Sequence, residues 1–336
     1  MVMKKTVAIV LAVAVFLSFG FLPGGESSAA GLVSAAVPAK YKNSCDVYRC
    51  IDISNHQGAL SVSQFQQIKA LGIPCVILRC GYTRLLTFSM NEDASFRTNI
   101  NNAYAAGMKI GVYYYSQAKN TDEAKREANY TLRLINPYRG KISMPVAFDY
   151  EFGGRLNAMV ARKAGRAAMT DNAITYCNTI RAAGYTPMFY GNVTMLNNYM
   201  NRDTVHAHYP VWLAHYTKSG KATDYSRDIY MWQYSSSGKL NRASTGKAIV
   251  KGRIDMDYVF VKKGTNFLPG SSAATFSAAY KVKMKKTVYK RKGPGKKYKK
   301  NGKAKKDRKY TIVETKNGWG KIKNKQWIKL SYTKRI

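Results

Sequence analysis

The chain has 336 residues, 46% of them hydrophobic, and carries 55 Lys and Arg against 18 Asp and Glu, a formal charge of +37. This length suffices for one large domain with a small one, or for two medium ones, and for an ample core. The charge excludes an acidic surface and predicts a polyanionic partner: nucleic acid, anionic lipid headgroups or acidic wall polymers. Composition alone does not choose among the three.

The first 36 residues have the order of a secretory signal peptide. Two lysines precede an apolar run over 7–22, and small residues follow between 27 and 36. A membrane anchor is the alternative, although the run is slightly short for a span. We expect residues 1–36 to be removed, leaving no membrane span in a secreted protein that is extracellular or associated with a cell wall. Export argues against nucleic acid as the partner.

Five cysteines in an exported chain allow two disulfides and leave one thiol over. Cys75 and Cys80 flank a predicted strand with odd spacing, which puts their side chains on opposite faces and out of mutual reach. Cys45 with Cys50, or either of them with Cys75, are more plausible pairs. The cysteines and the four histidines show no metal-ligand spacing, so we expect neither a metal nor a cofactor.

Strand-like and helix-like stretches alternate between Arg49 and Phe260. The eight strand candidates are CIDIS (50–54), VILRCGY (76–82), KIGVYYYSQA (109–118), MPVAFDYEF (144–152), TPMFYGN (186–192), YPVWLAHYT (209–217), DIYMWQYS (228–235) and GRIDMDYVF (252–260). Helical patterns lie between most of them, at 62–72, 96–107, 120–135 and 161–183, and Ser61 with Gln64 predicts a capping box before the first.

This order predicts an α/β fold with a parallel sheet. Eight strands fit an irregular (β/α)8 TIM-type barrel over residues 46–263, with the later helices short or missing. A doubly wound open sheet is the alternative, but no GxGxxG fingerprint or phosphate loop follows any strand.

Two regions follow the predicted barrel. Residues 264–278, GTNFLPGSSAATFSA, have the composition of a linker. Residues 279–336 hold 23 Lys and Arg against Asp307 and Glu314, a charge of +21. Their alternating residues and glycine turns predict a small all-β barrel. Disorder is the alternative for so charged a tail, but Trp319 and Trp327 favour a folded domain.

Five of the 18 acidic residues lie in three of the predicted strands. In PVAFDYEF large apolar residues alternate with Asp149 and Glu151, so both acids share one face. The same alternation holds for Asp52 in CIDIS and for Asp255 and Asp257 in RIDMDY. Because the first and last strands are neighbours in a closed barrel, we expect Asp52 and Asp255 to converge with the other acids at the C-terminal mouth, where active sites lie.

Clustered carboxyls without a metal motif suit glycoside cleavage. One carboxyl must stay protonated to donate to the leaving oxygen, while another supplies negative charge to an oxocarbenium-like centre. Repulsion between neighbouring carboxyls raises the pKa of one of them, and Glu151 is the candidate. A structural ion-pair cluster or a divalent-cation site are the alternatives.

Six stretches occur in a fixed order: IDISNHQG, VILRCGYT, AFDYEF, PVWLAHY, MWQYSSSG and GRIDMDYVF. Together they resemble the motifs of glycoside hydrolase family 25, the secreted muramidases or lysozymes. The resemblance implies an irregular β/α barrel that hydrolyses the β-1,4 bond between N-acetylmuramic acid and N-acetylglucosamine in bacterial peptidoglycan. It makes Glu151 the general acid/base of a retaining, substrate-assisted reaction. Asp149 would orient or stabilise the acetamido group of the sugar, and Asp52 and Asp255 match the other two acidic positions.

Further side chains near the predicted strand ends are candidates for the floor of a sugar cleft, with packing as an equally good alternative for each. They are Tyr82, Tyr113, Tyr115, Tyr190, Trp212, Tyr216, Trp232 and Gln233. The tail resembles a bacterial SH3-type domain through GPGKKY and NGWGKI, which implies wall binding, and its charge predicts anionic wall polymers as a partner. Two other functions compete: a non-catalytic wall-binding protein on the same barrel, and an endo-N-acetylglucosaminidase or chitinase-like enzyme. The complete set of acids argues against the former.

Overall fold

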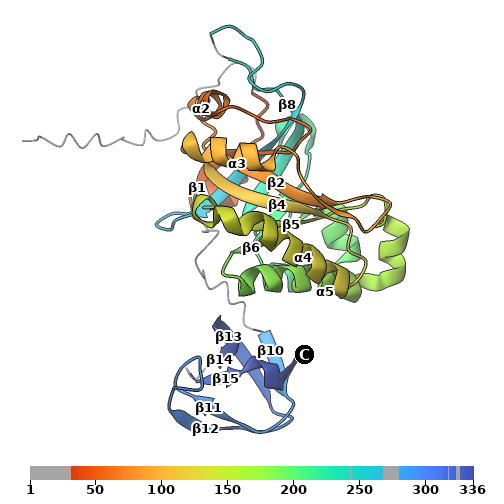
Figure 1. Cartoon of the computed structure of the whole chain (residues 1–336), viewed down its shortest axis with the longest axis vertical. Coiled ribbons are helices and arrows are strands. Elements are labelled where there is room, and N and C mark those ends of the chain that lie inside the picture. The colour runs from red at the N-terminus through yellow and green to blue at the C-terminus, as the bar shows by residue number, and fades with distance from the viewer. Residues whose placement is uncertain (1–31, 243, 268–279, 317, 323–325) are drawn as a thin grey trace, which may run out of the picture.

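The computed structural model describes residues 32–242, 244–267, 280–316, 318–322 and 326–336 (Figure 1). Most of the predicted signal peptide (1–31) and most of the predicted linker (268–278) lie outside the described residues. Within the described part of the chain, no helix is both long and apolar enough to cross a membrane.

Eight strands form a closed barrel, which confirms the predicted architecture over the open sheet (Figure 1). They are β1 (Cys45–Ile53), β2 (Cys75–Thr83), β4 (Lys109–Ser116), β5 (Val146–Tyr150), β6 (Pro187–Asn192), β7 (Val211–Ala214), β8 (Met231–Gly238) and β9 (Ile254–Lys262). The sheet order is β1-β9-β8-β7-β6-β5-β4-β2, and the pairing of β1 with β2 closes the barrel. All eight predicted strands are present. A short strand that was not predicted, β3 (Met90–Glu92), pairs with the end of β2.

The later helices are short or missing, as predicted. The α-helices are α1 (Ala39–Lys42), α2 (Val62–Ala70), α3 (Phe96–Ala105), α4 (Thr121–Ile135), α5 (Ala158–Ala182) and α6 (Arg202–His206). Among the described residues, α5 (25 residues) is followed by one short α-helix of 5 residues. Single-turn elements cover Asn136–Lys141, Met195–Tyr199 and Lys218–Gly220. The predicted capping box starts α2: the Gln64 N–H donates to Ser61 Oγ at 3.2 Å, and the Ser61 N–H donates to Gln64 Oε1 at 2.9 Å.

Alternation along the strands separates an outer core from an inner core. In β5, Val146, Phe148 and Tyr150 belong to the outer core that the helices cover, whereas Ala147 belongs to the inner core of the barrel. The predicted parity of this strand is therefore confirmed, and it directs Asp149 inward.

Strand β9 runs antiparallel to both of its neighbours. Lys262, at the end of β9, is the register partner of Cys45, at the start of β1. Asp255, near the start of β9, is therefore paired with Asp52, near the end of β1. In the parallel sheet predicted from the sequence, Asp255 would lie at the opposite end of the barrel. The reversal of β9 is what brings Asp255 to the mouth.

The predicted disulfides were wrong: all five cysteines are buried free thiols. Cys75 lies in the inner core and Cys80 in the outer core, as their odd spacing predicted. The same odd spacing separates Cys45, in the outer core, from Cys50, in the inner core. Cys50 and Cys75 are register partners on β1 and β2 and interact as thiols.

The C-terminal residues form a separate all-β unit with its own core, which confirms the predicted folded tail. Its strands are β10 (Tyr280–Met284), β11 (Val288–Arg291), β12 (Lys300–Ala304), β13 (Lys309–Lys316), β14 (Trp319–Ile322), β15 (Trp327–Lys329) and β16 (Thr333–Arg335). Neighbouring strands in the sheet follow the order β12-β11-β15-β14-β13-β10-β16. Val282, Ile312 and Ile328 are among the residues of its small core. Its SH3-type identity stays a prediction.

Candidate active site

The mouth of the barrel gathers all four predicted acids and a fifth. Asp149 lies near the end of β5 and Glu151 follows that strand, while Asp52 and Asp255 face them from β1 and β9. Asp52 and Asp149 are only 5% and 4% exposed, and Glu151 and Asp255 are half-buried. Asp257, two residues beyond Asp255 on the same strand, is fully buried.

Burial in this cluster disfavours negative charge. Burial and, second, the charge of Asp255 raise the pKa of Glu151 to about 7. Burial raises the pKa of Asp255 to about 6. Burial is also the main cause that raises the pKa of Asp149 well above its usual range, with further contributions from Glu151 and Asp52. At neutral pH the mouth therefore retains protons, as an acid catalyst requires.

Asp149 has an unused hydrogen-bonding position. Its Oδ1 atom is buried and has no hydrogen-bond partner among the described residues. Leaving a buried carboxyl oxygen unpaired is costly, so such an atom in a cluster of acids points to a group supplied by a ligand.

The cation that faces the acids, Arg79, was not among the predicted site residues. Arg79 on β2 holds Asp93, with Nε 2.7 Å from Oδ2, and also hydrogen-bonds Asn55. Its positive charge lowers the pKa of Asp149, partly offsetting the effect of burial. The sequence contained an indication of this role. Arg79 is four residues after Cys75 on the same strand and therefore faces inward like Cys75, and it is a charged residue in an otherwise apolar strand.

Gln233 is the centre of a hydrogen-bond network at the mouth. Its Nε2 donates to Asp52 Oδ2 at 2.8 Å. Its Oε1 accepts from the hydroxyls of Tyr190 at 2.9 Å and Tyr216 at 2.7 Å. These bonds fix the amide orientation, and Tyr216, which is 53% exposed, extends the network to the surface. The structure thus brings these three predicted residues together with the acids.

The other predicted sugar contacts have different positions. Tyr113 and Trp212 lie in the inner core, with ring centroids 5.9 Å apart. Tyr82 and Tyr115 are half-buried: the Tyr82 ring lies 5.1 Å from the Arg79 guanidinium, and the charges of Asp149 and Glu151 add to burial in raising the pKa of Tyr115.

The structure does not bring Trp232 to the mouth. It lies in the outer core, where its Nε1 donates to the carbonyl of His215 at 2.9 Å. Adjacent strand residues face opposite sides, so the inward position of Gln233 turns Trp232 outward. No group of His, Cys, Asp and Glu in the described ranges could hold a metal ion.

Comparison with protein-family models identifies the chain. Residues 51–243 match the model "Glycosyl hydrolases family 25". The chain belongs to this family. The matched region is more than half of the chain and contains Asp52, Asp149 and Glu151, while Asp255 follows its end. The glycoside hydrolase class predicted from the sequence is thereby confirmed, and a search of curated protein sequences finds no significant match.

Solved structures of this fold come from several bacterial and phage proteins. The modular autolysin LytC from Streptococcus pneumoniae is 25% identical, with a TM-score of 0.52 over 63% of this chain and 46% of its own, so the alignment spans less than half of LytC. The catalytic domain of endolysin ply40 from bacteriophage P40 of Listeria monocytogenes is 20% identical, with a TM-score of 0.51 over 65% of this chain and 94% of its own. The Clostridium perfringens spore cortex lytic enzyme SleM is 13% identical, with a TM-score of 0.51 over 86% and 97%. The last two show the shared fold alone.

The electrostatics of this family 25 mouth predict a pH effect for Asp255→Asn. A catalytic acid at Glu151 would be active only below its pKa of about 7, so kcat/KM should fall as the pH rises through that value. Removing the charge of Asp255 lowers that pKa, so the alkaline limb should move to lower pH by roughly one unit. The pH profile of kcat/KM on a soluble glycan measures the shift. Asp228→Asn, at a side chain 93% exposed, is the matched control and should leave the limb in place. An unmoved limb in Asp255→Asn would contradict the coupling.

Proposed function

We propose that this chain is a secreted peptidoglycan hydrolase, an N-acetylmuramidase that cleaves the β-1,4 bond between N-acetylmuramic acid and N-acetylglucosamine. The observation that carries the proposal is the cluster of acids at the mouth, where the carboxyls of Glu151 and Asp149 differ in burial and partners. LytC, the neighbour at 25% identity, is an autolysin, and one of its structures holds a synthetic peptidoglycan ligand. Both facts support a wall glycan as the substrate.

In this proposal Glu151 is the general acid/base. It is half-buried, with a pKa of about 7, so it carries a proton at the start of the reaction and can donate it to the leaving glycosidic oxygen. Once ionised, it can accept a proton from the attacking water. Its position after the last residue of β5 leaves it closer to solvent than Asp149, as a group that exchanges protons with water requires.

Asp149 is proposed to contact the acetamido group of the sugar. Its unpaired Oδ1 is available to orient or stabilise the acetamido group, whose carbonyl oxygen would displace the leaving oxygen at the anomeric carbon with inversion. Water then attacks the same carbon and inverts it again, so that the configuration is retained overall. In the proposed reaction Asp149 acts in its ionised form, which Arg79 favours although burial disfavours it, and its charge would stabilise the positive charge that develops on the acetamido group. Asp52 and Asp255 complete the acidic wall of the subsite.

Analysis of the reaction products tests the proposal. Purified peptidoglycan is digested with the full chain, and the fragments are reduced and identified by mass spectrometry. Fragments that end in reducing N-acetylmuramic acid are expected. Reducing N-acetylglucosamine ends would instead identify an endo-N-acetylglucosaminidase, and binding to the wall without any release of fragments would identify a non-catalytic wall-binding protein.

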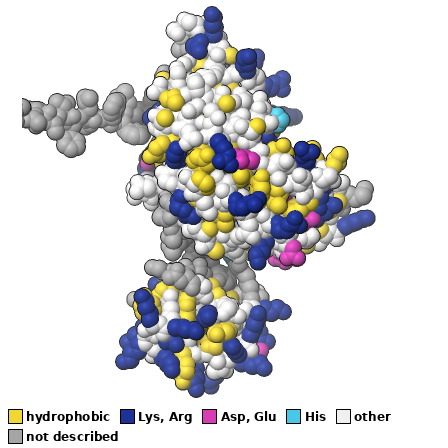
Figure 2. Space-filling model, in the orientation of Figure 1, with side chains coloured by type: hydrophobic (Ala, Val, Ile, Leu, Met, Phe, Trp, Pro, Cys, Tyr) yellow, Lys and Arg dark blue, Asp and Glu magenta, His cyan; other side chains and the backbone are white. Residues whose placement is uncertain are grey.

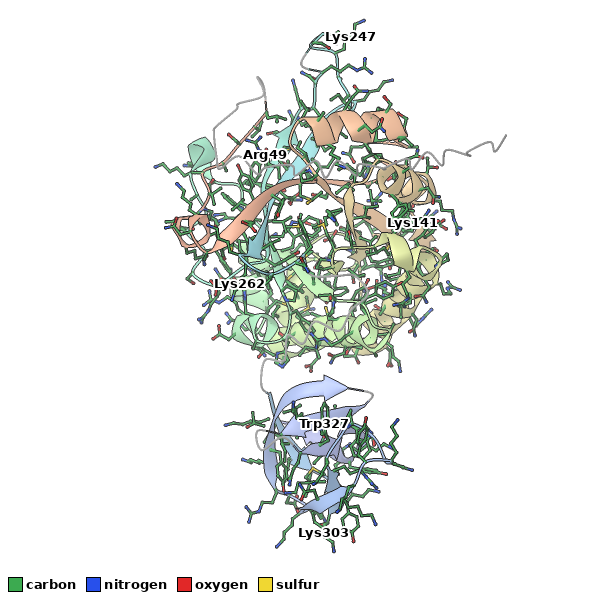
Figure 3. The ribbon with its side chains drawn as sticks, turned by 90° about the vertical axis from the view of Figure 1, so that its left-hand side faces the viewer. Arg49, Lys141, Lys247, Lys262, Lys303 and Trp327 are labelled. Atoms are coloured by element: carbon green, nitrogen blue, oxygen red, sulfur yellow. The ribbon has the colours of Figure 1, made fainter. Side chains whose placement is uncertain are left out.

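We further propose that the C-terminal unit binds anionic wall polymers. Residues 279–336 carry a charge of +21, and Lys and Arg side chains cover much of the visible face of the unit (Figure 2). Several of these cations lie over aromatic rings, including Lys300 and Lys303 at 4.4 and 5.5 Å from the ring centroid of Tyr289. Figure 3 shows Lys303 at the edge of the unit, exposed to solvent.

Ending the chain after Phe267 should therefore weaken wall binding without changing the chemistry. This end point keeps the Phe267 ring on Tyr48, with centroids 4.6 Å apart. Cleavage of a small soluble glycan should stay unchanged, whereas binding of whole walls should fall, because tethering raises the local concentration of the barrel at an insoluble substrate.

The salt dependence of wall binding distinguishes an anchoring role of the C-terminal unit from a role in solubility alone. Binding of the full chain in a wall pull-down should weaken as salt rises, because exposed charges are screened over roughly 8 Å at physiological ionic strength. If the full and shortened chains bind walls equally at low salt, the C-terminal unit has no anchoring role.

A further inference from the structure

Asp257 has no role in the reaction as proposed so far, yet it lies at the centre of the inner wall below the mouth. It is fully buried, and its Oδ1 accepts a hydrogen bond from Trp212 Nε1 at 2.8 Å. Its second oxygen, Oδ2, is buried and receives no hydrogen bond from a donor among the described residues. A buried carboxyl with one oxygen left over calls for an explanation.

Strand register places this carboxyl against Asp52. Across the β1–β9 pair, Asp52 is opposite Asp255 and Cys50 is opposite Asp257, so Asp52 and Asp257 are diagonal neighbours on the inward face. The two carboxyls lie within hydrogen-bonding reach of each other. Two ionised carboxylates have no hydrogen to share, so this contact requires a proton on one of the two.

The surroundings assign that proton to Asp257. The described groups that act on it electrostatically are acids, a thiol and phenols. They are Asp52 and Cys50 from β1, Asp255 from β9, Tyr216 from the loop before β8, and Tyr234 from β8. Burial first, then the charge of Asp52, raise the pKa of Asp257 well above its usual range, and the contact with Asp52 adds to the rise. Burial and the charge of Asp255 also raise the pKa of Asp52, but there the contact with Asp257 acts in the opposite direction and lowers it. Asp52 also has a second donor, Gln233 Nε2 at 2.8 Å, which favours its charged form.

We propose that Asp257 is a positioning residue: a neutral carboxylic acid whose Oδ2–H donates to Asp52 and holds that carboxylate in place at the floor of the mouth. The hydrogen bonds then run in one direction around the wall, from Trp212 to Asp257 to Asp52, with Gln233 donating to Asp52 from the other side. Gln233 in turn accepts from Tyr190 and Tyr216, so the proton on Asp257 fixes the arrangement as far as the surface. The catalytic part of this inference rests on the proposed glycosidase function, whereas the protonation of Asp257 does not.

Two substitutions at Asp257 separate the hydrogen bond from the charge. Asp257→Asn can accept from Trp212 through its carbonyl and donate to Asp52 through its amide, so kcat/KM at pH 6 should stay within about threefold of the wild type. Asp257→Leu removes both bonds at similar volume, and kcat/KM should fall roughly 10–100-fold, as is typical for residues that hold a functional group in place. The loss should appear mainly in kcat, because Asp257 is too buried to touch the substrate.

A readout without substrate tests the proton directly. A carboxyl that is neutral when folded and ionised when unfolded stabilises the fold at low pH, and it loses that contribution as the pH rises above its unfolded value near 4. The difference in Tm between Asp257→Asn and the wild type should therefore grow in favour of the variant between about pH 4 and pH 8. The infrared spectrum of the wild type at neutral pH should contain a protonated-carboxyl band that weakens in Asp257→Asn. Asp228→Asn should show neither effect.

Three results would overturn the proposal. The first is an Asp257→Asn variant that is folded by circular dichroism but has lost activity at pH 6, which would mean that the negative charge is required. The second is a Tm difference that does not change with pH, which would mean that Asp257 is ionised in the folded protein. The third is wild-type kcat in a folded Asp257→Leu variant. If that variant does not fold, the asparagine variant and its pH series decide alone, and they do so even if the substrate proves not to be peptidoglycan.

Discussion

Replacing Glu151 by Gln is expected to reduce the lysis of purified walls by at least about 10²–10⁴-fold, the usual range for loss of a general acid. Glutamine has nearly the same size and can still hydrogen-bond, but it has no proton to give to the leaving oxygen. The loss should exceed that range if the same carboxyl also acts as the base in the second step. The rate of clearing of a wall suspension and kcat/KM on a soluble glycan both measure it.

The fold of this variant should be intact. Glu151 is half-buried with a raised pKa, so its ionised form costs stability at neutral pH, and the neutral glutamine should keep or slightly raise the Tm. Glu92→Gln is the matched control: Glu92 lies on β3, pairs with Arg97 at the surface, and should retain full activity. A Glu151→Gln protein that clears walls at a near-normal rate would show that another group is the acid.

Replacing Asp149 by Asn is expected to reduce kcat by about 10²–10³-fold with little change in KM, the magnitude seen when one electrostatic contact to a transition state is removed. The substitution keeps the shape of the side chain but removes the charge that Arg79 favours. The unpaired Oδ1 position would then be held by an amide that cannot stabilise a developing positive charge.

Measurements of Tm distinguish a loss of transition-state stabilisation in Asp149→Asn from misfolding of the variant. The pKa of Asp149 is raised well above its usual range, so the wild type loses stability as the pH rises above the unfolded value near 4. Asp149→Asn should therefore be as stable as the wild type at pH 4 and more stable at pH 7, although nearly inactive at both. A variant that loses kcat and Tm together would indicate a structural role for Asp149, and one that keeps kcat would remove it from the mechanism.

Much of the barrel could be predicted because its strands are short and their two faces differ in chemistry. In β5 large apolar residues alternate with a small residue and two acids, and this pattern determines both the strand and its inward face. Helices α2 to α5 were equally clear, since their apolar positions recur at helical spacing and some begin with a capping residue. Such local patterns depend only on neighbours in the chain.

What could not be predicted depends on partners distant in sequence. The direction of β9 is decided by its pairing with β1 and β8, and nothing within RIDMDYVF differs between a parallel and an antiparallel strand. Arg79 and Asp257 were missed as members of the site because each becomes informative only beside its partner, Asp149 or Asp52. Trp232 was a candidate for the sugar cleft because it lies near a predicted strand end, but it has the opposite parity to Gln233 and packs in the outer core.

The reversal of β9 also determines where the chain leaves the barrel. β9 begins at the acidic mouth and ends at Lys262, next to the start of β1, and Phe267 then packs on Tyr48 beside a pocket of about 240 Å³ lined also by Lys109 and Ser143 at the starts of β4 and β5. The exit is therefore on the end of the barrel opposite to the acids. A solid support or a foreign binding module joined after Phe267 would hold the enzyme by the end opposite the acids and would leave the mouth free to meet a long glycan strand.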